Sequence, residues 1–232
     1  MTNTDDKRCI LFFAKYPQIG QVKTRLGGEI GDEHAVELHK RFVLDMLSML
    51  KGLETDIIIA VDPADACGSF SEWTGGQYRY IGQVGRNIGE KMKNALEAAF
   101  EQDYDRAVLI GSDLPDLPAD FLRYALDAID RYDAVMGPAH DGGYYLVGFG
   151  RKSFLPEVFR GMAWGGEEVF TRTMNLLDQA GRRTYILPEW YDIDTAADLQ
   201  NLVIRCNDTK DAAAQTMAYI TENKLVTLVD TN

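Results

Sequence analysis

The chain has 232 residues and a formal net charge of −12, from 36 acidic residues against 24 Lys and Arg residues. This charge disfavours binding to nucleic acid or to an anionic membrane surface, since like charges repel. No apolar run approaches the ~20 residues that span a membrane, the polar start MTNTDDKRC is unlike a signal peptide, and the three cysteines form no metal-binding pattern. We therefore expect a cytoplasmic protein with free thiols.

Short β-branched or aromatic runs alternate with helical patterns along the chain. Helices are predicted over 32–51 and 87–101, where apolar residues recur at helical spacing, and the expected strands are 9–14, 56–61, 78–81, 106–110, 132–136, 143–149 and 183–187. This alternation predicts a three-layer α/β/α, Rossmann-like domain with a mixed, mostly parallel sheet. Only a short segment separates 132–136 from 143–149, so we expect these two strands to be antiparallel or diverging.

The chain shows no repeat or linker. We expect residues 1–206 to form a single domain and residues 207–232 to form a C-terminal helical appendage packed on it. Within that tail, the pattern predicts a helix over 211–219 and an apolar segment over 224–229.

The loop after the first strand, AKYPQIGQVKTRLGG, contains no acidic residue and carries the cations Lys15, Lys23 and Arg25 around Gly20. Lysine offers a compact charge and arginine a two-pronged donor, and both suit phosphate oxygens. Neither the Walker A spacing nor the GxGxxG dinucleotide spacing fits. A solvated basic turn is the alternative. Ligands of open α/β sheets bind beyond the carboxyl ends of the strands, so the loop's position favours a small anionic ligand.

The segment Gly111-Ser112-Asp113 directly follows the apolar strand 106–110. A carboxylate at this edge is a natural Mg²⁺ ligand. Asp113 could instead cap a turn or a helix. Asp116 is available for that cap, so we expect Asp113 to be free to bind a metal.

Two later loops also carry polar residues. The stretch PAHDGGYY contains adjacent glycines that allow close approach to a ligand, although Asp-Gly is also a common turn signal, and both readings remain open. After the last strand, Thr195 and Asp198 fit a capping box that starts a helix. Asp192 and Asp194 precede it in an extended segment, which places both carboxylates on one side. No nucleophile–base pattern is found around the histidines or cysteines.

Together, the segments "FAKYPQIGQVKTRL", "GSDLP", "GPAHDGGYYLVG" and "DIDTAADL" resemble the GT-A-type nucleotidyltransferase/glycosyltransferase superfamily, which has the nucleotide-diphospho-sugar transferase fold. Within it, they are most similar to the branch labelled radical-SAM/selenodomain-associated transferase. The molybdenum-cofactor and phospholactate guanylyltransferases are more distant. The likeness runs from about Cys9 to Leu202. "GQVGRNIGEKM" also resembles that branch's G-x-G-D-L-G-E-R-M, with Asn87, Ile88 and Lys91 as departures.

The resemblance implies a nucleotide donor and a divalent metal, Mg²⁺ or Mn²⁺, bound by a GT-A-like catalytic domain over residues 1–206. It implies metal ligands at Asp113 and Asp194 and a phosphate-binding role for the basic loop, and we expect catalytic roles for Lys23, Arg25, Asp113 and Asp141. The implied nucleotide- and phosphate-binding positions are Lys15, Gly20, Lys23, Arg25, Gly85, Asn87, Gly111 and Ser112. The implied acceptor region comprises Gly142, Gly143, Tyr144 and Trp164.

We therefore expect a metal-dependent transferase in which a small phosphorylated or acidic acceptor attacks the α-phosphorus of a nucleoside triphosphate. Such transfer depends on positioning and charge neutralisation more than on a protein nucleophile. One alternative is a glycosyltransferase with a nucleotide-diphospho-sugar donor, for which Asp141 is the candidate general base. Another is a non-catalytic nucleotide-binding protein. The expected partners are a nucleotide or nucleotide-sugar donor and a small acceptor, with neither nucleic acid nor membrane.

Overall fold

The computed structural model describes residues 7–207 and 212–226, and within these residues seven strands form one sheet. The strands are β1 (Arg8–Lys15), β2 (Asp56–Asp62), β3 (Arg79–Gly82), β4 (Arg106–Ile110), β5 (Ala134–Pro138), β6 (Tyr144–Gly150) and β7 (Thr184–Ile186). Their order is β3-β2-β1-β4-β6-β5-β7. Strand β6 runs antiparallel to β4 and β5, whereas the other pairings are parallel. The predicted mixed, mostly parallel sheet is confirmed, and β5 and β6 are antiparallel.

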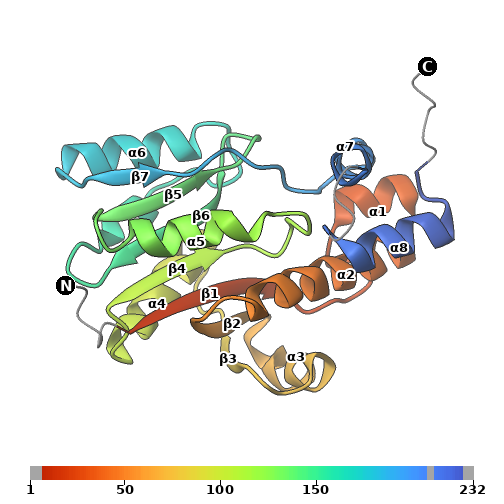
Figure 1. Ribbon diagram of the computed structural model, residues 1–232, viewed down its shortest axis with the longest axis horizontal. Coiled ribbons are helices and arrows are strands. Elements are labelled where there is room, and N and C mark those ends of the chain that lie inside the picture. Colours follow the sequence, from red (N-terminus) through yellow and green to blue (C-terminus); the bar gives the residue numbers. More distant parts are fainter. Residues whose placement is uncertain (1–6, 208–211, 227–232) are drawn as a thin grey trace.

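Helices connect most of the strands (Figure 1). They are α1 (Thr24–Ile30), α2 (Asp32–Lys51), α3 (Cys67–Thr74), α4 (Ile88–Glu101), α5 (Ala119–Ala128), α6 (Val169–Gln179), α7 (Ala196–Cys206) and α8 (Ala214–Asn223), with short 3₁₀ turns η1 (Ala64–Ala66) and η2 (Pro156–Phe159). The two helices predicted from apolar spacing are present as α2 and α4. In the described part of the chain, no helix is both long and apolar enough to cross a membrane.

The helix predicted over 211–219 is found later, as α8 at Ala214–Asn223. Its start is fixed from outside the segment, because the Asp45 carboxylate on α2 accepts the backbone N–H groups of Gln215 and Thr216. Sequence spacing within the tail could not reveal this partner. Asp211 lies outside the described residues, as does the end of the expected apolar segment, from 227 onward.

The core has two faces, which the alternation along β1 separates. Ile10 and Phe12 pack in a cluster that includes buried residues of α2, α3 and α5. Leu11 and Phe13 point to the opposite face and pack with residues of α4 and α6. Because successive side chains of a strand alternate, a strand covered on both faces becomes a continuous apolar run. The predicted three-layer architecture is confirmed.

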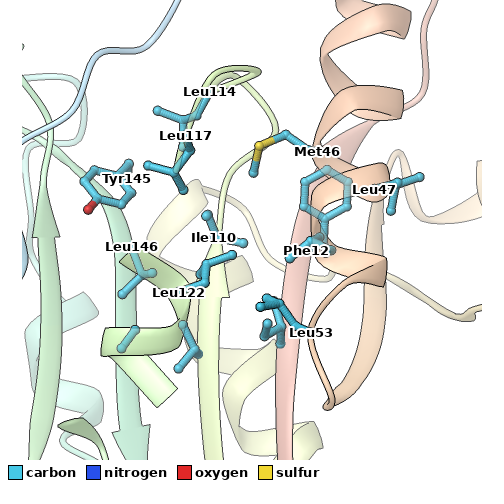
Figure 2. Close-up of a cluster of buried hydrophobic side chains, with 14 of the residues drawn as sticks. Phe12, Met46, Leu47, Leu53, Ile110, Leu114, Leu117, Leu122, Tyr145 and Leu146 are labelled. Atoms are coloured by element: carbon cyan, nitrogen blue, oxygen red, sulfur yellow. The ribbon is translucent and has the colours of Figure 1, made fainter. Parts of the chain in front are cut away.

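Figure 2 shows the first of these faces, where side chains from separate elements meet. Phe12 of β1, Ile110 of β4, Met46 of α2 and Leu122 of α5 belong to this cluster, and all four are fully buried. Burying such side chains stabilises a fold by about 1.5–3 kcal/mol each. This packing holds the carboxyl ends of β1 and β4 beside each other.

A third cluster lies beyond the end of the sheet toward which β1 points, where α1, α7 and α8 gather around α2 (Figure 1). Leu26 of α1, Phe42 of α2 and Leu199 of α7 are fully buried in it, and Ile220 of α8 is nearly so. The cluster anchors both α1, which follows the basic loop, and α7, which follows Asp194. The division into a domain of residues 1–206 and an appendage of residues 207–232 stays a prediction.

Candidate phosphate and metal site

The segments that follow β1, β4 and β7 meet at the carboxyl edge of the sheet around a cleft of about 410 Å³. Seven of the site residues expected from the sequence line this cleft: Lys15, Lys23, Arg25, Gly111, Ser112, Asp113 and Asp194. The remaining lining comes from Phe13, Ala14, Val22, Thr24, His39, Gln83 and Ile88. The fold therefore brings together cations and carboxylates that are up to 179 positions apart, from Lys15 to Asp194.

Backbone hydrogen bonds explain why the two aspartates meet. The Ile193 N–H donates to the Asp113 carbonyl over 3.1 Å, which lays the segment before α7 against the loop after β4. The Asp198 carboxylate then accepts the N–H groups of Asp194 and Thr195, and the predicted capping box at the start of α7 is confirmed. Asp194 is therefore held at the start of an anchored helix.

Lys23 lies between the two carboxylates. Its Nζ is 2.9 Å from Asp113 Oδ2 and 2.9 Å from Asp194 Oδ1, and the side chain is only 4% exposed. Burial alone would lower the pKa of the Lys23 ammonium, but Asp113 and Asp194 outweigh it and raise this pKa. The Lys23 side chain is therefore buried in an ion-paired triad.

The backbone of Lys23 is also unusual. It has φ 49° and ψ 42°, the left-handed region, at the residue that precedes α1. Such a conformation in a residue with a long side chain costs on the order of 1–3 kcal/mol and persists only where surrounding structure imposes it. Here Leu26 is locked in the third cluster, and the Lys23 Nζ lies 5.8 Å from the centre of the Phe42 ring. The folded helices thus direct Lys23 toward the aspartates.

The other two cations of the loop are more open to solvent. Arg25 is 71% exposed, and its Nη1 is 3.7 Å from Asp194 Oδ2. Lys15 is exposed at the end of β1. Exposed ion pairs at such distances contribute little to stability, so both side chains are available to a ligand.

His39 is a site residue that the sequence reading missed. Its Nε2 donates to the Lys15 carbonyl over 2.9 Å, so in the neutral ring the proton is on Nε2. The Nδ1 lies 3.9 Å from Asp113 Oδ1 and makes no hydrogen bond within the described residues. Burial lowers the pKa of His39, which favours the neutral ring. A polar residue on the apolar face of the predicted helix 32–51, in line with Phe42, was the signal that could have identified it.

A second, smaller hollow of about 190 Å³ adjoins the cleft and shares Arg25 and Asp194 with it. Half of its lining residues are aspartates, and the full lining comprises Arg25, His140, Asp141, Tyr191, Asp192, Asp194, Thr195 and Asp198. Burial, followed by the charge of Asp113, raises the pKa of Asp192 to about 8. Asp141, predicted as catalytic, lies in this hollow. The sequence had singled out Asp192 without assigning it a role.

Three of the expected nucleotide-binding positions do not line the cleft. Asn87 caps α4, since its Oδ1 accepts the Glu90 N–H over 2.9 Å. Gly85 packs so closely on α4 that an added Cβ would lie 2.7 Å from the Lys91 backbone nitrogen. Gly20 lies within the basic loop but outside the cleft lining. The structure gives Asn87 and Gly85 roles in positioning α4.

The residues of the expected acceptor region line neither the cleft nor the second hollow. Tyr144 and Trp164 are in edge-to-face contact, with ring centroids 6.3 Å apart, and burial raises the pKa of the Tyr144 hydroxyl. Trp164 in turn lies against Gly89 of α4, where any Cβ would collide with the indole. The Gly143 N–H donates to Asp141 Oδ1 over 2.9 Å, so this turn orients Asp141. Gly142 likewise leaves no room for a Cβ beside the backbone of Glu167.

Asp116 does not cap α5, contrary to the sequence-based expectation. Pro118 takes the position before that helix without any side-chain cap. The Asp116 carboxylate is buried and accepts from Arg205 Nε over 2.7 Å and from Trp190 Nε1 over 3.3 Å. It therefore ties the loop after β4 to α7.

The residues around the cleft fit a magnesium ion that is shared with phosphate. Asp113 and Asp194 already converge on one cation, the ammonium of Lys23. Within the described ranges, no three His, Cys, Asp or Glu side chains are grouped so as to hold a metal by themselves. Mg²⁺ in proteins takes one or two carboxylates and completes its octahedron with substrate phosphates and water. The carboxylate pair matches that pattern and does not match an all-protein metal cage.

The comparisons with known proteins agree with this fold. A solved structure named "putative nucleotide-diphospho-sugar transferase" from Desulfovibrio desulfuricans G20 is 42% identical, with a TM-score of 0.89 over 94% of this chain and 95% of that chain. A cytidylyltransferase from Leptospira borgpetersenii is 16% identical, with a TM-score of 0.57 over 94% of this chain and 95% of that one. CMP:2-keto-3-deoxy-manno-octonic acid synthetase complexed with CTP is 12% identical, with a TM-score of 0.54 over 87% and 99%.

The curated proteins include no match to the sequence. The resemblance to the nucleotidyltransferase/glycosyltransferase superfamily is confirmed, while the radical-SAM-associated branch stays a prediction. Residues 46–166, about half of the chain, match the family model described as "Uncharacterized protein conserved in bacteria (DUF2064)". With this match and the 42% identical relative, the chain belongs to the DUF2064 family and has the nucleotide-diphospho-sugar transferase fold.

Proposed function

We propose that this protein is a transferase that uses a nucleoside triphosphate or a nucleotide sugar as its donor. One observation carries the proposal: Lys15, Lys23 and Arg25 share a single cleft with Asp113 and Asp194. Cations suit the phosphates, and the carboxylate pair suits a phosphate-bound Mg²⁺. The name of the 42% identical relative, "putative nucleotide-diphospho-sugar transferase", supports the same donor class.

In this proposal each side chain acts mainly through its charge. Lys15 and Arg25 bind and orient the donor phosphates, because both are exposed in the cleft. Asp113 and Asp194 would hold Mg²⁺, which when bound neutralises negative charge on the phosphates. No covalent intermediate on the protein is required, since transfers between phosphate-linked groups rely on positioning and electrostatic stabilisation.

The second hollow supports a proposal about the acceptor. Asp141 and Asp198 line it beside Asp194, so a phosphorylated or acidic acceptor, as expected from the sequence, would be repelled by their negative charge. An uncharged compound with hydroxyl groups would find hydrogen-bond acceptors there. Asp141 is oriented by the Gly143 N–H and is the candidate base for a hydroxyl proton. This environment favours glycosyl transfer to a hydroxyl, with nucleotidyl transfer as the second candidate.

The product phosphate distinguishes these reactions. We would incubate the protein with Mg²⁺, free sugars and polyols, and either nucleoside triphosphates or nucleotide sugars, and follow the reaction by ³¹P NMR. Glycosyl transfer releases a nucleoside diphosphate, whereas nucleotidyl transfer releases pyrophosphate. Asp194→Asn should abolish the product, while Asp62→Asn, whose carboxylate pairs with Lys91 outside the cleft, should not. Equal phosphate release by wild type and Asp194→Asn would contradict the proposal.

A further inference from the structure

We infer that the Asp113–Asp194 pair binds a divalent cation only together with the donor phosphates, because Lys23 holds the cation position in the free protein. The ligand of this site is then the metal–nucleotide chelate and not the free metal ion. This inference rests on the proposed function and adds the order in which its components bind.

The geometry of the triad is the first support. Asp113 Oδ2 and Asp194 Oδ1 are each 2.9 Å from the same Lys23 Nζ, so the two oxygens that face each other are both occupied. The carboxylates are 39% and 43% exposed, while the ammonium between them is 4% exposed. The Lys23 ammonium is thus the buried member of the triad, and its partners Asp113 and Asp194 line the cleft.

The charges give the second support. Lys23 cancels half of the negative charge that would attract a free divalent ion. A buried ammonium that loses both partners is left uncompensated, which is strongly unfavourable. Mg²⁺ also gives up its water reluctantly. Free Mg²⁺ therefore has no favourable way to replace Lys23.

Donor phosphates change this balance because they offer Lys23 new anionic partners inside the same cleft. Lys15 and Arg25, both exposed there, can receive the phosphates before Lys23 moves. Arg25 approaches only the outer oxygen of Asp194, at 3.7 Å, and does not block the facing pair. In the same step, the Lys23 ammonium leaves Asp113 and Asp194 to pair with the donor phosphates, and the two freed carboxylates would bind the metal ion.

Mn²⁺ alone is the first probe, followed by electron paramagnetic resonance, which reports free Mn²⁺ directly. Lys23→Met keeps an unbranched side chain of nearly the same length, one atom shorter, and removes its charge. We expect wild type to bind Mn²⁺ weakly, and Lys23→Met to bind it at least about tenfold more tightly. Lys91→Met is the matched control, since Lys91 pairs with the single carboxylate of Asp62 at 2.7 Å, and it should leave Mn²⁺ affinity unchanged.

Thermal unfolding of the wild-type protein is the second measurement. It tests whether the metal binds only together with the nucleotide even if Lys23→Met does not fold. Mg²⁺ alone should leave Tm unchanged, whereas Mg²⁺ with an equimolar mixture of ADP, GDP, CDP, UDP and TDP should raise it more than the nucleotides alone. Tight Mn²⁺ binding by free wild type, or a Tm increase with Mg²⁺ alone, would overturn the inference and leave the proposed function standing. Absence of any joint effect of metal and nucleotides would overturn both.

Discussion

The Thr216 N–H and hydroxyl both donate to the Asp45 carboxylate, over 2.9 and 2.7 Å, so a residue of α2 caps the start of α8. Asp45 is 8% exposed and Thr216 is fully buried. This contact attaches the C-terminal helix to the helix that carries His39 and Phe42. Its loss would leave buried donors of α8 without an acceptor.

Asp45→Ala should lower the free energy of unfolding by about 1–3 kcal/mol, the usual cost of leaving buried polar groups unsatisfied. Denaturant unfolding monitored by circular dichroism measures this change. Asp120→Ala removes an exposed aspartate from the first turn of α5 and serves as the control, with an expected change near zero. Equal losses in the two variants would show that the Asp45 contact contributes nothing special.

A chain that ends at Asn207 should still bind the donor nucleotide, because no residue beyond Asp194 lines the cleft. Its Tm should fall, and its solubility should decrease, since removing α8 uncovers the apolar cluster around Phe42. Calorimetric titration of both proteins with nucleotide and Mg²⁺ tests this directly. A soluble truncated protein that no longer binds nucleotide would place part of the site in the tail.

Asp113→Asn should abolish the Mg²⁺-dependent part of nucleotide binding and leave the part due to Lys15 and Arg25. The free variant should be less stable by about 1 kcal/mol, because Lys23 loses one of its two charged partners. Titration in Mg²⁺ and in EDTA measures the binding, and thermal unfolding measures the stability. An unchanged Mg²⁺ enhancement would remove Asp113 from the metal site.

Asp192 should make stability depend on pH. Burial raises its pKa to about 8 in the folded protein, whereas an unfolded aspartate titrates near pH 4. Between these values the folded state binds more protons than the unfolded state, so stability falls as pH rises from about 4 to 8. Asp192→Asn should therefore stabilise the protein by an amount that grows toward pH 8, on the order of 2 kcal/mol after solvent screening.

To test this prediction, the free energy of unfolding of both proteins would be measured at pH 5, 6.5 and 8. Asp178→Asn, which alters an exposed carboxylate of α6, provides the baseline. A stabilisation by Asp192→Asn that is the same at all three pH values would show that Asp192 is ionised throughout this range.

The sequence located the aspartates better than it located Lys23. Asp113 and Asp194 each stand after a recognisable strand, and strand ends meet at one edge in a mostly parallel sheet. The burial of Lys23 depends on the neighbouring positions of β1 and β4 and on the Ile193–Asp113 hydrogen bond. These are long-range relationships that a local pattern does not contain. His39 was overlooked for a similar reason, since its partner is the Lys15 carbonyl, on a different element.

The turn between β5 and β6 lies outside the pairing of β1 with β4. Because β6 runs antiparallel to β5, the chain turns back at the carboxyl edge of the sheet through residues 139–143, which include Asp141. The exposed residues of this turn, His140 and Asp141, can change without shifting the register of β1 against β4, whereas Gly142 is fixed by the backbone of Glu167. Under the proposed function, substitutions at these two exposed positions would alter the choice of acceptor and leave the donor-binding side chains in place.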